Sequence, residues 1–519
     1  MAVSCSTPRA AGWTATVAVA LALTGCGSTV ASRGSAGGLA NTGQGAGLGQ
    51  PAAVASGGPV NAGAPAQPGS EGAASGRANS PAGPGAAVAQ NAAGYDSTAA
   101  VAGTSRRSAS GAALPPGVTA TTIKLGVFRS SSEDQSNAQA GFGGVGASGA
   151  TAKMQAVIAD LNRRGGVLGR KVELVFHNYD ETSTSTTTSQ VDQQACDDWT
   201  QDRRVYAVLS SGFSPTLTAC LAKAGVLQLT PGPTTDDPTS TFRRAPRYFS
   251  AGAIALDRQG TSYVRGLQSQ GFFGTAPDTK VGLVTFDTPE FKAAAGVAKR
   301  AMTALRAAVY DSYVQRPENN AGIAAAQAAL QNVILRYRQE GVDHVTFLDS
   351  GAGLTAFFML QADAQGYRPK YGLSTQSQPA FLRAAGIAKS QLEGAVAVGW
   401  VPVLDVGASG AMLPPGARAC FSLMQRSGQD VSSPQGQIYA AAACDSASFF
   451  AAALTAAQSF APDAVVKAAE RLPDYASAAT YRVRLASDRH DGAAAVRLAA
   501  FDDACDCFRY TSSSLIATG

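Results

Sequence analysis

The chain has 519 residues, of which 41 are Lys or Arg and 36 are Asp or Glu, so its formal net charge is only +5. It contains no basic run with interleaved aromatic residues, and nucleic acid is therefore not an expected partner. The residues that follow position 119 are too many for one hydrophobic core and suit two lobes.

The N-terminus carries the pattern of an export signal. Arg9 supplies a positive charge, and an uncharged, largely apolar run follows over residues 13–23. The run is shorter than the roughly 20 apolar residues that span a bilayer, so residues 1–25 are predicted to be a secretory signal peptide. The tetrapeptide LTGC that ends at Cys26 matches a bacterial lipobox, which predicts cleavage before Cys26 and a lipid on its thiol. A plain signal peptide with an incidental cysteine is the alternative.

Residues 26–119 have the composition of a flexible tether. They are rich in Gly, Ala, Ser and Pro and contain few large apolar side chains. Such a segment cannot bury enough surface to offset the entropy of ordering, so we expect disorder. No later segment is expected to be long and apolar enough to span a membrane. The protein is therefore predicted to lie on the extracytoplasmic face of a bacterial cell membrane, anchored there by its lipid.

From Thr121 onward the sequence alternates between predicted strands and helices. Apolar runs predict strands over residues 123–128, 171–176, 205–209 and 226–229. Helical spacing of apolar residues predicts helices over 148–162, 190–199 and 215–224. Strands that alternate with helices favour a parallel sheet with helices on both faces.

The same alternation restarts in the second half of the chain. Helices are expected over residues 257–270, 291–308 and 321–340, and strands over 281–286, 342–348, 371–374 and 394–400. Two Ala-rich helices are expected over 437–458 and 461–472. Residues 481–485 and 495–501 flank a turn that contains Asp491 and Gly492, which predicts a β-hairpin, and 505–510 is a further possible strand.

Three stretches of the sequence resemble one known family. Residues 165–180 read GGVLGRKVELVFHNYD, residues 230–234 read TPGPT after an expected strand, and residues 495–510 read AVRLAAFDDACDCFRY. In this order and spacing they resemble the type I periplasmic binding proteins, specifically the branched-chain amino acid (leucine/isoleucine/valine) binding group. The resemblance implies an α/β fold of two lobes, each a mainly parallel sheet flanked by helices, which are joined by three crossovers.

The resemblance also implies a function. It predicts the solute-binding component of an ABC importer, a monomer that captures a small polar solute (amino acid-like, amide or carboxylate) between two closing lobes and delivers it to the transporter permease. Lobe one would contain residues 120–250 and 401–475, and lobe two residues 251–400 and 476–519. A ligand-sensing lipoprotein without a transport role is the main alternative, and a secreted hydrolase is the weaker one.

Candidate ligand contacts in lobe one follow two neighbouring strands, because parallel sheets bind ligands beyond the carboxyl ends of their strands. The loop SSGFS precedes a helix whose free N–H groups attract a carboxylate, and two threonines follow the next strand. By resemblance, Ser211 matches the serine that holds the ligand carboxylate and Thr234 matches a threonine that contacts the ligand. Helix capping and an ordinary turn are the structural alternatives. The predicted contacts in lobe one are Ser210, Ser211, Phe213, Ser214, Thr234 and Thr235.

In lobe two the match with amino acid-binding members of the family weakens. The family has an aromatic residue after the first strand of this lobe, where Phe291 is nearest and Asp287 lies in the same loop. Small residues that begin at Asp349 replace a family tyrosine, and the acid that holds the ligand's ammonium falls near Thr375, which carries no charge. A buried, unpaired ammonium is costly, so a standard α-amino acid is not expected unless Asp287 or Asp349 takes over that contact.

The residues give little support for an enzyme. The three histidines, His177, His344 and His490, lie far apart, and none belongs to a metal-binding spacing. The stretch after Gly212 lacks the closing glycine of a nucleophile elbow. We therefore expect no catalysis, no metal and no cofactor.

Six cysteines follow the lipid site, an even number that fits an oxidising compartment. Cys196 and Cys220 are expected on neighbouring helices and should form a disulfide, and Cys420 with Cys444 is the next expected pair. The last two cysteines lie two residues apart on the possible strand 505–510. Their Cα atoms would then be roughly 6.5–7 Å apart, which is the upper limit for a bridge and leaves that pair open.

Overall fold

The computed structural model describes residues 114–139, 149–230, 232, 234–274, 279–407, 413–473 and 475–518. The chain divides into two compact units, Met1–Ala87 and Val88–Gly519, and every described residue belongs to the second. The predicted signal peptide, the lipid site at Cys26 and nearly all of the predicted tether lie outside the described residues.

Five parallel strands form the first sheet, in the order β2-β1-β3-β4-β5. These strands are β1 (Thr122–Ser130), β2 (Lys171–Tyr179), β3 (Ala207–Val208), β4 (Leu227–Thr230) and β5 (Tyr248–Ser250). The intervening helices are α1 (Glu133–Gln139), α2 (Ala150–Arg163), α3 (Thr188–Asp197), α4 (Pro215–Ala224) and α5 (Thr239–Arg244). β4 and β5 are buried at every position, which is typical of strands in a parallel sheet that is covered on both faces.

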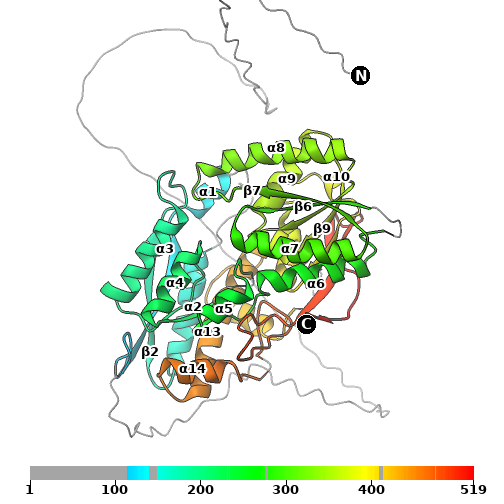
Figure 1. Cartoon of the computed structure of the whole chain (residues 1–519). Helices are drawn as coiled ribbons and strands as arrows, with labels where there is room; N and C mark the ends of the chain where they lie inside the picture. Colours follow the sequence, from blue (N-terminus) through cyan, green and yellow to red (C-terminus); the bar gives the residue numbers. More distant parts are fainter. Residues whose placement is uncertain are drawn as a thin grey trace, which may run out of the picture. The chain divides into compact units, whose positions relative to one another are not determined.

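The second sheet has the order β12-β11-β10-β9-β8-β6-β7, and β13 pairs with β11 outside this path. Its parallel strands are β6 (Lys280–Phe286), β7 (Ala308–Val314), β8 (His344–Leu348), β9 (Lys370–Ser374) and β10 (Val396–Gly399). The antiparallel ones are β11 (Ala495–Asp502), β12 (Cys507–Tyr510) and β13 (Ile516–Ala517). The helices are α6 (Leu256–Ser269), α7 (Pro289–Ala304), α8 (Gly322–Glu340), α9 (Gly353–Ala364) and α10 (Lys389–Leu392), and α6 and α7 lie side by side in Figure 1.

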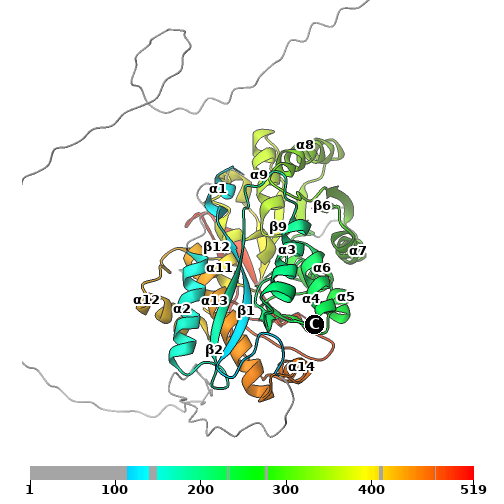
Figure 2. The ribbon, with the colours of Figure 1, turned by 90° about the vertical axis from the view of Figure 1, so that its left-hand side faces the viewer.

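The chain passes between the two sheets three times. It first leaves the first sheet after β5, and it leaves the second after β10 to form α11 (Pro402–Asp405), α12 (Ala417–Arg426), α13 (Pro434–Ala457) and α14 (Pro462–Ala469). α12 and α13 pack against α2 beside the first sheet, as Figure 2 shows, before β11 returns to the second. The predicted two-lobed type I fold is thereby confirmed.

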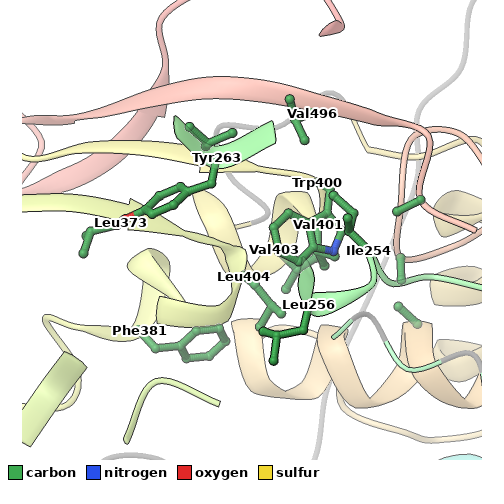
Figure 3. Close-up of a cluster of buried hydrophobic side chains, with 14 of the residues drawn as sticks. Ile254, Leu256, Tyr263, Leu373, Phe381, Trp400, Val401, Val403, Leu404 and Val496 are labelled. Carbon is green, nitrogen blue, oxygen red and sulfur yellow. The ribbon is translucent and has the colours of Figure 1, made fainter. Parts of the chain in front are cut away.

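Buried side chains from distant parts of the sequence fill the core where these passages meet (Figure 3). Tyr263 of α6, Trp400 after β10 and Val496 of β11 converge there, and all three are buried. A cavity of only about 10 Å³ remains among them. The segments that join the lobes are therefore as closely packed as a protein interior.

Among the described residues, one helix is long and apolar enough by length and composition to cross a membrane. This helix is α13, so the expectation that no segment after the tether would meet these criteria is wrong. Most of its apolar window is buried inside the protein, and the helix packs against α2 and α14. These contacts are those of a core helix, whose apolar surface is covered by its neighbours.

All three cysteine pairs are bridged. Cys196–Cys220 links α3 to α4, and the pairing of Cys420 with Cys444 links α12 to α13, as predicted. The pair left open by the sequence, Cys505–Cys507, is also a disulfide. The strand expected from residue 505 begins only at Cys507, and a turn with a left-handed Asp506 (φ 53°) brings the two Cα atoms to 5.2 Å.

The prediction that two strands form a hairpin about Asp491 is wrong. Residues 481–485 contribute only isolated bridges, and β11 pairs with β10 and β12 instead. The turn is held to another segment because the buried carboxylate of Asp491 accepts a hydrogen bond from Ala255 N at 2.8 Å and pairs with Arg258 of α6.

Candidate ligand-binding site

Loops that follow strands of the two sheets contact one another directly. After β4 in the first sheet, the Asp236 carboxylate pairs with Arg316 Nη2 at 2.8 Å and accepts a hydrogen bond from Ser350 Oγ at 2.6 Å. The preceding carbonyl, that of Thr235, accepts a hydrogen bond from Gln376 Nε2 at 2.9 Å. The partners follow β7, β8 and β9 of the second sheet, so the carboxyl ends of strands in both sheets face a common junction.

A second set of contacts joins the same two parts of the molecule. Thr188, at the start of α3, donates its backbone N–H to Glu318 O and its hydroxyl to Glu318 Oε2, both at 2.9 Å. The segment before α8 also reaches α1, where Asn320 hydrogen-bonds with Gln139 (Figure 1). The residues between β7 and α8 therefore contact three separate segments that belong to the first sheet.

The N-terminus of α4, where the sequence predicts binding of a ligand carboxylate, already holds a carboxylate of the protein. Asp192 of α3 accepts hydrogen bonds from Phe213 N at 3.0 Å, from Ser214 N at 2.7 Å and from the Ser214 hydroxyl at 2.7 Å. Ser214 is also the N-cap residue, because its Oγ accepts from Thr216 N. Burial raises the pKa of Asp192, against the lowering effect of these hydrogen bonds. Ser214 therefore caps α4, which is the structural alternative to ligand binding that the sequence left open for this loop.

Ser211 and Thr234 differ from their neighbours in this loop pair. Ser211 is exposed and Thr234 half-buried, and neither hydroxyl has a hydrogen-bond partner among the described residues. By contrast, Ser210 Oγ accepts from a strand amide of β1 at 3.1 Å, and Thr235 Oγ1 accepts from Asp237 N at 3.1 Å. A Cβ placed on Gly232 would lie 3.5 Å from Ser211 Oγ, so the two loops are adjacent.

An aromatic surface adjoins Ser211. The ring of Phe213 is half-buried, and its centroid lies 4.9 Å from that of Phe128 and 4.8 Å from that of Tyr179. These rings come from the loop after β3 and from the ends of β1 and β2. They offer an apolar surface next to the Ser211 hydroxyl, an arrangement that suits a solute with both polar and apolar parts.

In the second sheet, the side chain of Asp349 is not accessible to a solute. It is fully buried after β8, and its carboxylate accepts hydrogen bonds from Leu354 N at 3.2 Å, Thr355 N at 2.8 Å and the Thr355 hydroxyl at 2.7 Å, as well as from Ser350 N. Burial raises its pKa, which these bonds partly offset. Asp349 therefore fixes the start of α9.

Thr375 is also buried, and its hydroxyl is fully used. It donates to Asp405 Oδ1 at 2.7 Å and accepts from Trp400 N at 2.8 Å. Asp405 further accepts from Val401 N at 3.0 Å and from Tyr510 Oη at 3.1 Å, and burial raises its pKa to about 7. A carboxylate therefore does lie beside Thr375, but it is enclosed by the protein. Asp405 could not be identified from the sequence as a partner of Thr375, because the two residues are 30 positions apart in the chain.

The remaining candidates of lobe two point to a residue that the sequence did not single out. Phe291 is buried, 5.3 Å from Phe286, and Arg316 lies over both rings with its guanidinium carbon 6.0 and 5.8 Å from their centroids. Asp287 is exposed and pairs with Lys292. Arg316, half-buried on this aromatic surface, is thus the cation that lobe two presents to the junction.

The described residues contain no group of three or more His, Cys, Asp or Glu side chains that could hold a metal ion. The three histidines stay apart: His177 pairs with Asp198, His344 with Asp343, and His490 with Glu470. Among the described residues, the junction presents hydroxyls, an aromatic surface and Arg316, which suit reversible binding of a small molecule.

Two mainly parallel sheets are joined by three crossovers, and the loops that follow their parallel strands meet, which is the architecture of a two-lobed binding protein. A family described as periplasmic binding protein matches residues 122–506, which is most of the chain. The chain therefore belongs to the periplasmic binding protein family, and the resemblance drawn from the sequence is confirmed. A comparison with curated proteins gave no match.

Solved structures share the fold at low sequence identity. A fatty acid ABC transporter substrate-binding protein from Thermomonospora curvata is 16% identical, with a TM-score of 0.59, and the match covers 78% of this chain and 95% of that one. A solute-binding protein from R. palustris in complex with 4-hydroxybenzoate is 15% identical (TM-score 0.55, 76% and 97% covered). A leucine-binding protein from Thermotoga maritima is 13% identical (TM-score 0.55, 76% and 98% covered).

Proposed function

We propose that this protein captures a small solute between its two lobes and delivers it to the permease of an ABC importer. The observation that carries this proposal is the junction itself, where the loop after β4 contacts the loops after β7, β8 and β9. Ligands of parallel sheets bind beyond the carboxyl ends of strands, and a solute that contacts both lobes favours the closed arrangement over the open one. Proteins of the same fold include a fatty acid ABC transporter substrate-binding protein and a solute-binding protein in complex with 4-hydroxybenzoate.

The solute that fits this junction best has a polar, anionic end and an apolar body. The hydroxyls of Ser211 and Thr234 have no hydrogen-bond partner in the part of the chain that the structure describes, and Phe213 supplies an apolar surface. Arg316 can take a carboxylate in place of Asp236, since exchanging one carboxylate for another keeps the arginine paired. Small carboxylates such as those named for the relatives therefore rank above standard α-amino acids, whose ammonium finds Asp349 and Asp405 enclosed.

Most of the other predicted contacts have a structural role. Their polar groups are engaged within the protein or their side chains are buried, and they hold the loops in place: Ser210, Ser214, Thr235, Phe291, Asp349 and Thr375. Asp287 stays at the rim, paired with Lys292.

The rest of the proposal concerns architecture and location. Lobe one comprises residues 120–250 and 401–475, and lobe two residues 251–400 and 476–519. A lipid on Cys26 and the tether over 26–119 hold a monomeric binding protein at the outer face of the cell membrane. The protein performs no catalysis of its own, because its role is to bind and release the solute.

A screen of melting temperature tests the proposal. The full chain is heated with amino acids, amides, small carboxylates and polyamines in turn. A ligand present at 100 times its dissociation constant stabilises the fold by about 2.7 kcal/mol, which is readily measured. We expect small carboxylates to raise the melting temperature and Ser211→Ala to reduce that rise. A screen in which no class of solute stabilises the protein would contradict the proposal.

A further inference from the structure

A second pocket lies within the first lobe, away from the junction. Its volume is about 360 Å³, and it is bounded by α4, by α5, by Asp463 of α14 and by the amino-terminal parts of β4 and β5. Val226 and Tyr248, which precede or begin these strands, contribute to its wall, whereas the junction is built from the loops that follow the same strands. Nothing in the proposed solute site uses these residues.

Gln228, one of the residues that line this pocket, has a buried polar atom without a partner among the described residues. Gln228 is 1% exposed, and its Nε2 donates to Ser210 O at 3.1 Å. Its Oε1 is buried and accepts no hydrogen bond from any described residue. A buried acceptor of this kind is costly unless a donor is supplied, and no described residue supplies one. The hydroxyl of Thr218, which also lines the pocket, has no partner among the described residues either.

Two arginines line the pocket, and they differ in what they already bind. Arg247 is engaged, because its Nε and Nη2 bond to Asp463 Oδ1 at 3.1 and 2.8 Å. Arg244 is exposed and makes only a 3.3 Å hydrogen bond to Thr241 Oγ1, with no carboxylate in ion-pair distance among the described residues. The charge that remains available at the pocket is therefore positive.

We propose that this pocket is a second small-molecule site, which takes a short hydroxyl-bearing carboxylate. The hydroxyl donates to Gln228 Oε1, the carboxylate binds Arg244, and the carbon chain packs on Leu221 and Val226. A hydroxyl fits better than an ammonium because a buried ammonium needs a negative partner, and the amide oxygen of Gln228 is neutral. Since Gln228 also holds the carbonyl of Ser210, the bound molecule lies one side chain away from the loop that carries Ser211.

Calorimetry on the full chain tests this site with two matched series of probes. One contains the ω-hydroxyalkanoates from glycolate to 5-hydroxypentanoate, and the other contains the alkanoates of the same length. We expect at least one hydroxy acid to bind, and to bind more tightly than its partner that lacks the hydroxyl. Arg244→Gln should weaken that binding roughly 10- to 150-fold, the effect of losing a hydrogen bond to a charged group.

Arg243→Gln is the matched control, because Arg243 is the exposed neighbour on the same helix and does not line the pocket. It should leave the affinity for the hydroxy acid unchanged. Equal affinities of the two arginine variants would overturn the proposal, as would equal binding of hydroxylated and plain alkanoates or no binding of either series. Binding that survives Arg244→Gln and disappears in Ser211→Ala would assign the probe to the junction instead and would also overturn it.

Discussion

The loop after β3 in the first sheet leaves the Ser211 hydroxyl without a partner among the described residues, whereas the loop after β8 in the second encloses the Asp349 carboxylate in four hydrogen bonds. Both residues follow parallel strands, and the sequence marks both as candidate ligand contacts. The difference lies in what each loop must do for the fold. Asp349 starts α9, while in the first sheet Asp192 and Ser214 start α4 and so release Ser211 from that task.

This contrast teaches that a position shared with a family does not by itself make a ligand contact. A polar group is available to a solute only when the local fold is satisfied without it. By that criterion lobe one presents Ser211 and Thr234, and lobe two presents Arg316.

The largest effect is expected from Asp349→Ala. Four donors around a buried carboxylate would lose their acceptor, so the free energy of unfolding should fall by about 3 kcal/mol or more. Asp287→Ala, in the equivalent loop after β6, removes only an exposed ion pair and should cost less than about 1 kcal/mol. Urea denaturation measures both. Equal stability of the two variants would mean that Asp349 has no structural role and is again a candidate ligand contact.

The next effect is a pH dependence that comes from Asp405. Burial raises the pKa of its folded form to about 7, above the 3.8 of the unfolded chain, so protonation favours folding. The stability that it contributes is complete below about pH 4 and is lost as the pH rises to 7, with a slope of up to about 1.4 kcal/mol per pH unit.

Asp405→Asn removes this titration, so its free energy of unfolding should fall less steeply between pH 4 and pH 7 than that of the wild type. Denaturant titrations at a series of pH values measure the two slopes. Parallel curves for the variant and the wild type would show that the carboxyl group is not enclosed as described.

Ser214→Ala should have a smaller effect of about 1 kcal/mol on stability, because it removes the N-cap of α4. Asp192 remains to accept from Phe213 N and the amide of residue 214, which limits the loss. Thermal unfolding of the protein without solute gives the value. An unchanged stability would contradict the assignment of Ser214 to capping.

The smallest effect is expected from Asp236→Asn, which removes a partly exposed ion pair between the lobes. Such pairs contribute up to about 1 kcal/mol, so the ratio of open to closed protein should rise by no more than about fivefold without solute. Small-angle scattering should show a larger radius of gyration for the variant, and saturating solute should restore the wild-type value. A radius that solute does not change would argue against lobe closure.

Most of the fold could be predicted from local sequence signals. α4 was expected over 215–224 and has those bounds, because Pro215 lies in its first turn and Gly225 takes the left-handed conformation that ends a helix. β7 was not predicted, since the Ala-rich helix before it was extended to residue 308. That helix ends at Ala304, and Arg306 adopts a left-handed conformation (φ 65°) without any residue type that signals it.

The candidate site was predictable only in part, for a physical reason. Strand order places Ser211 and Thr234 in neighbouring loops, and the sequence anticipates both. The roles of Arg316 and Asp405 depend on contacts with residues far away in the chain, Asp236 and Thr375. No local pattern encodes such tertiary pairs, and the same is true of Asp192, whose carboxylate occupies the helix N-terminus that the sequence assigned to the solute.

The central claim is that Ser211 binds solute while Ser214, three residues later, builds the loop. Calorimetric titration of the wild type, Ser211→Ala and Ser214→Ala with the carboxylate that the melting screen identifies tests it most directly. We predict that Ser211→Ala binds roughly 10- to 150-fold more weakly with unchanged stability, as expected for the loss of a hydrogen bond to a charged group. Ser214→Ala should keep nearly wild-type affinity. The opposite pattern, with affinity lost only in Ser214→Ala, would contradict it.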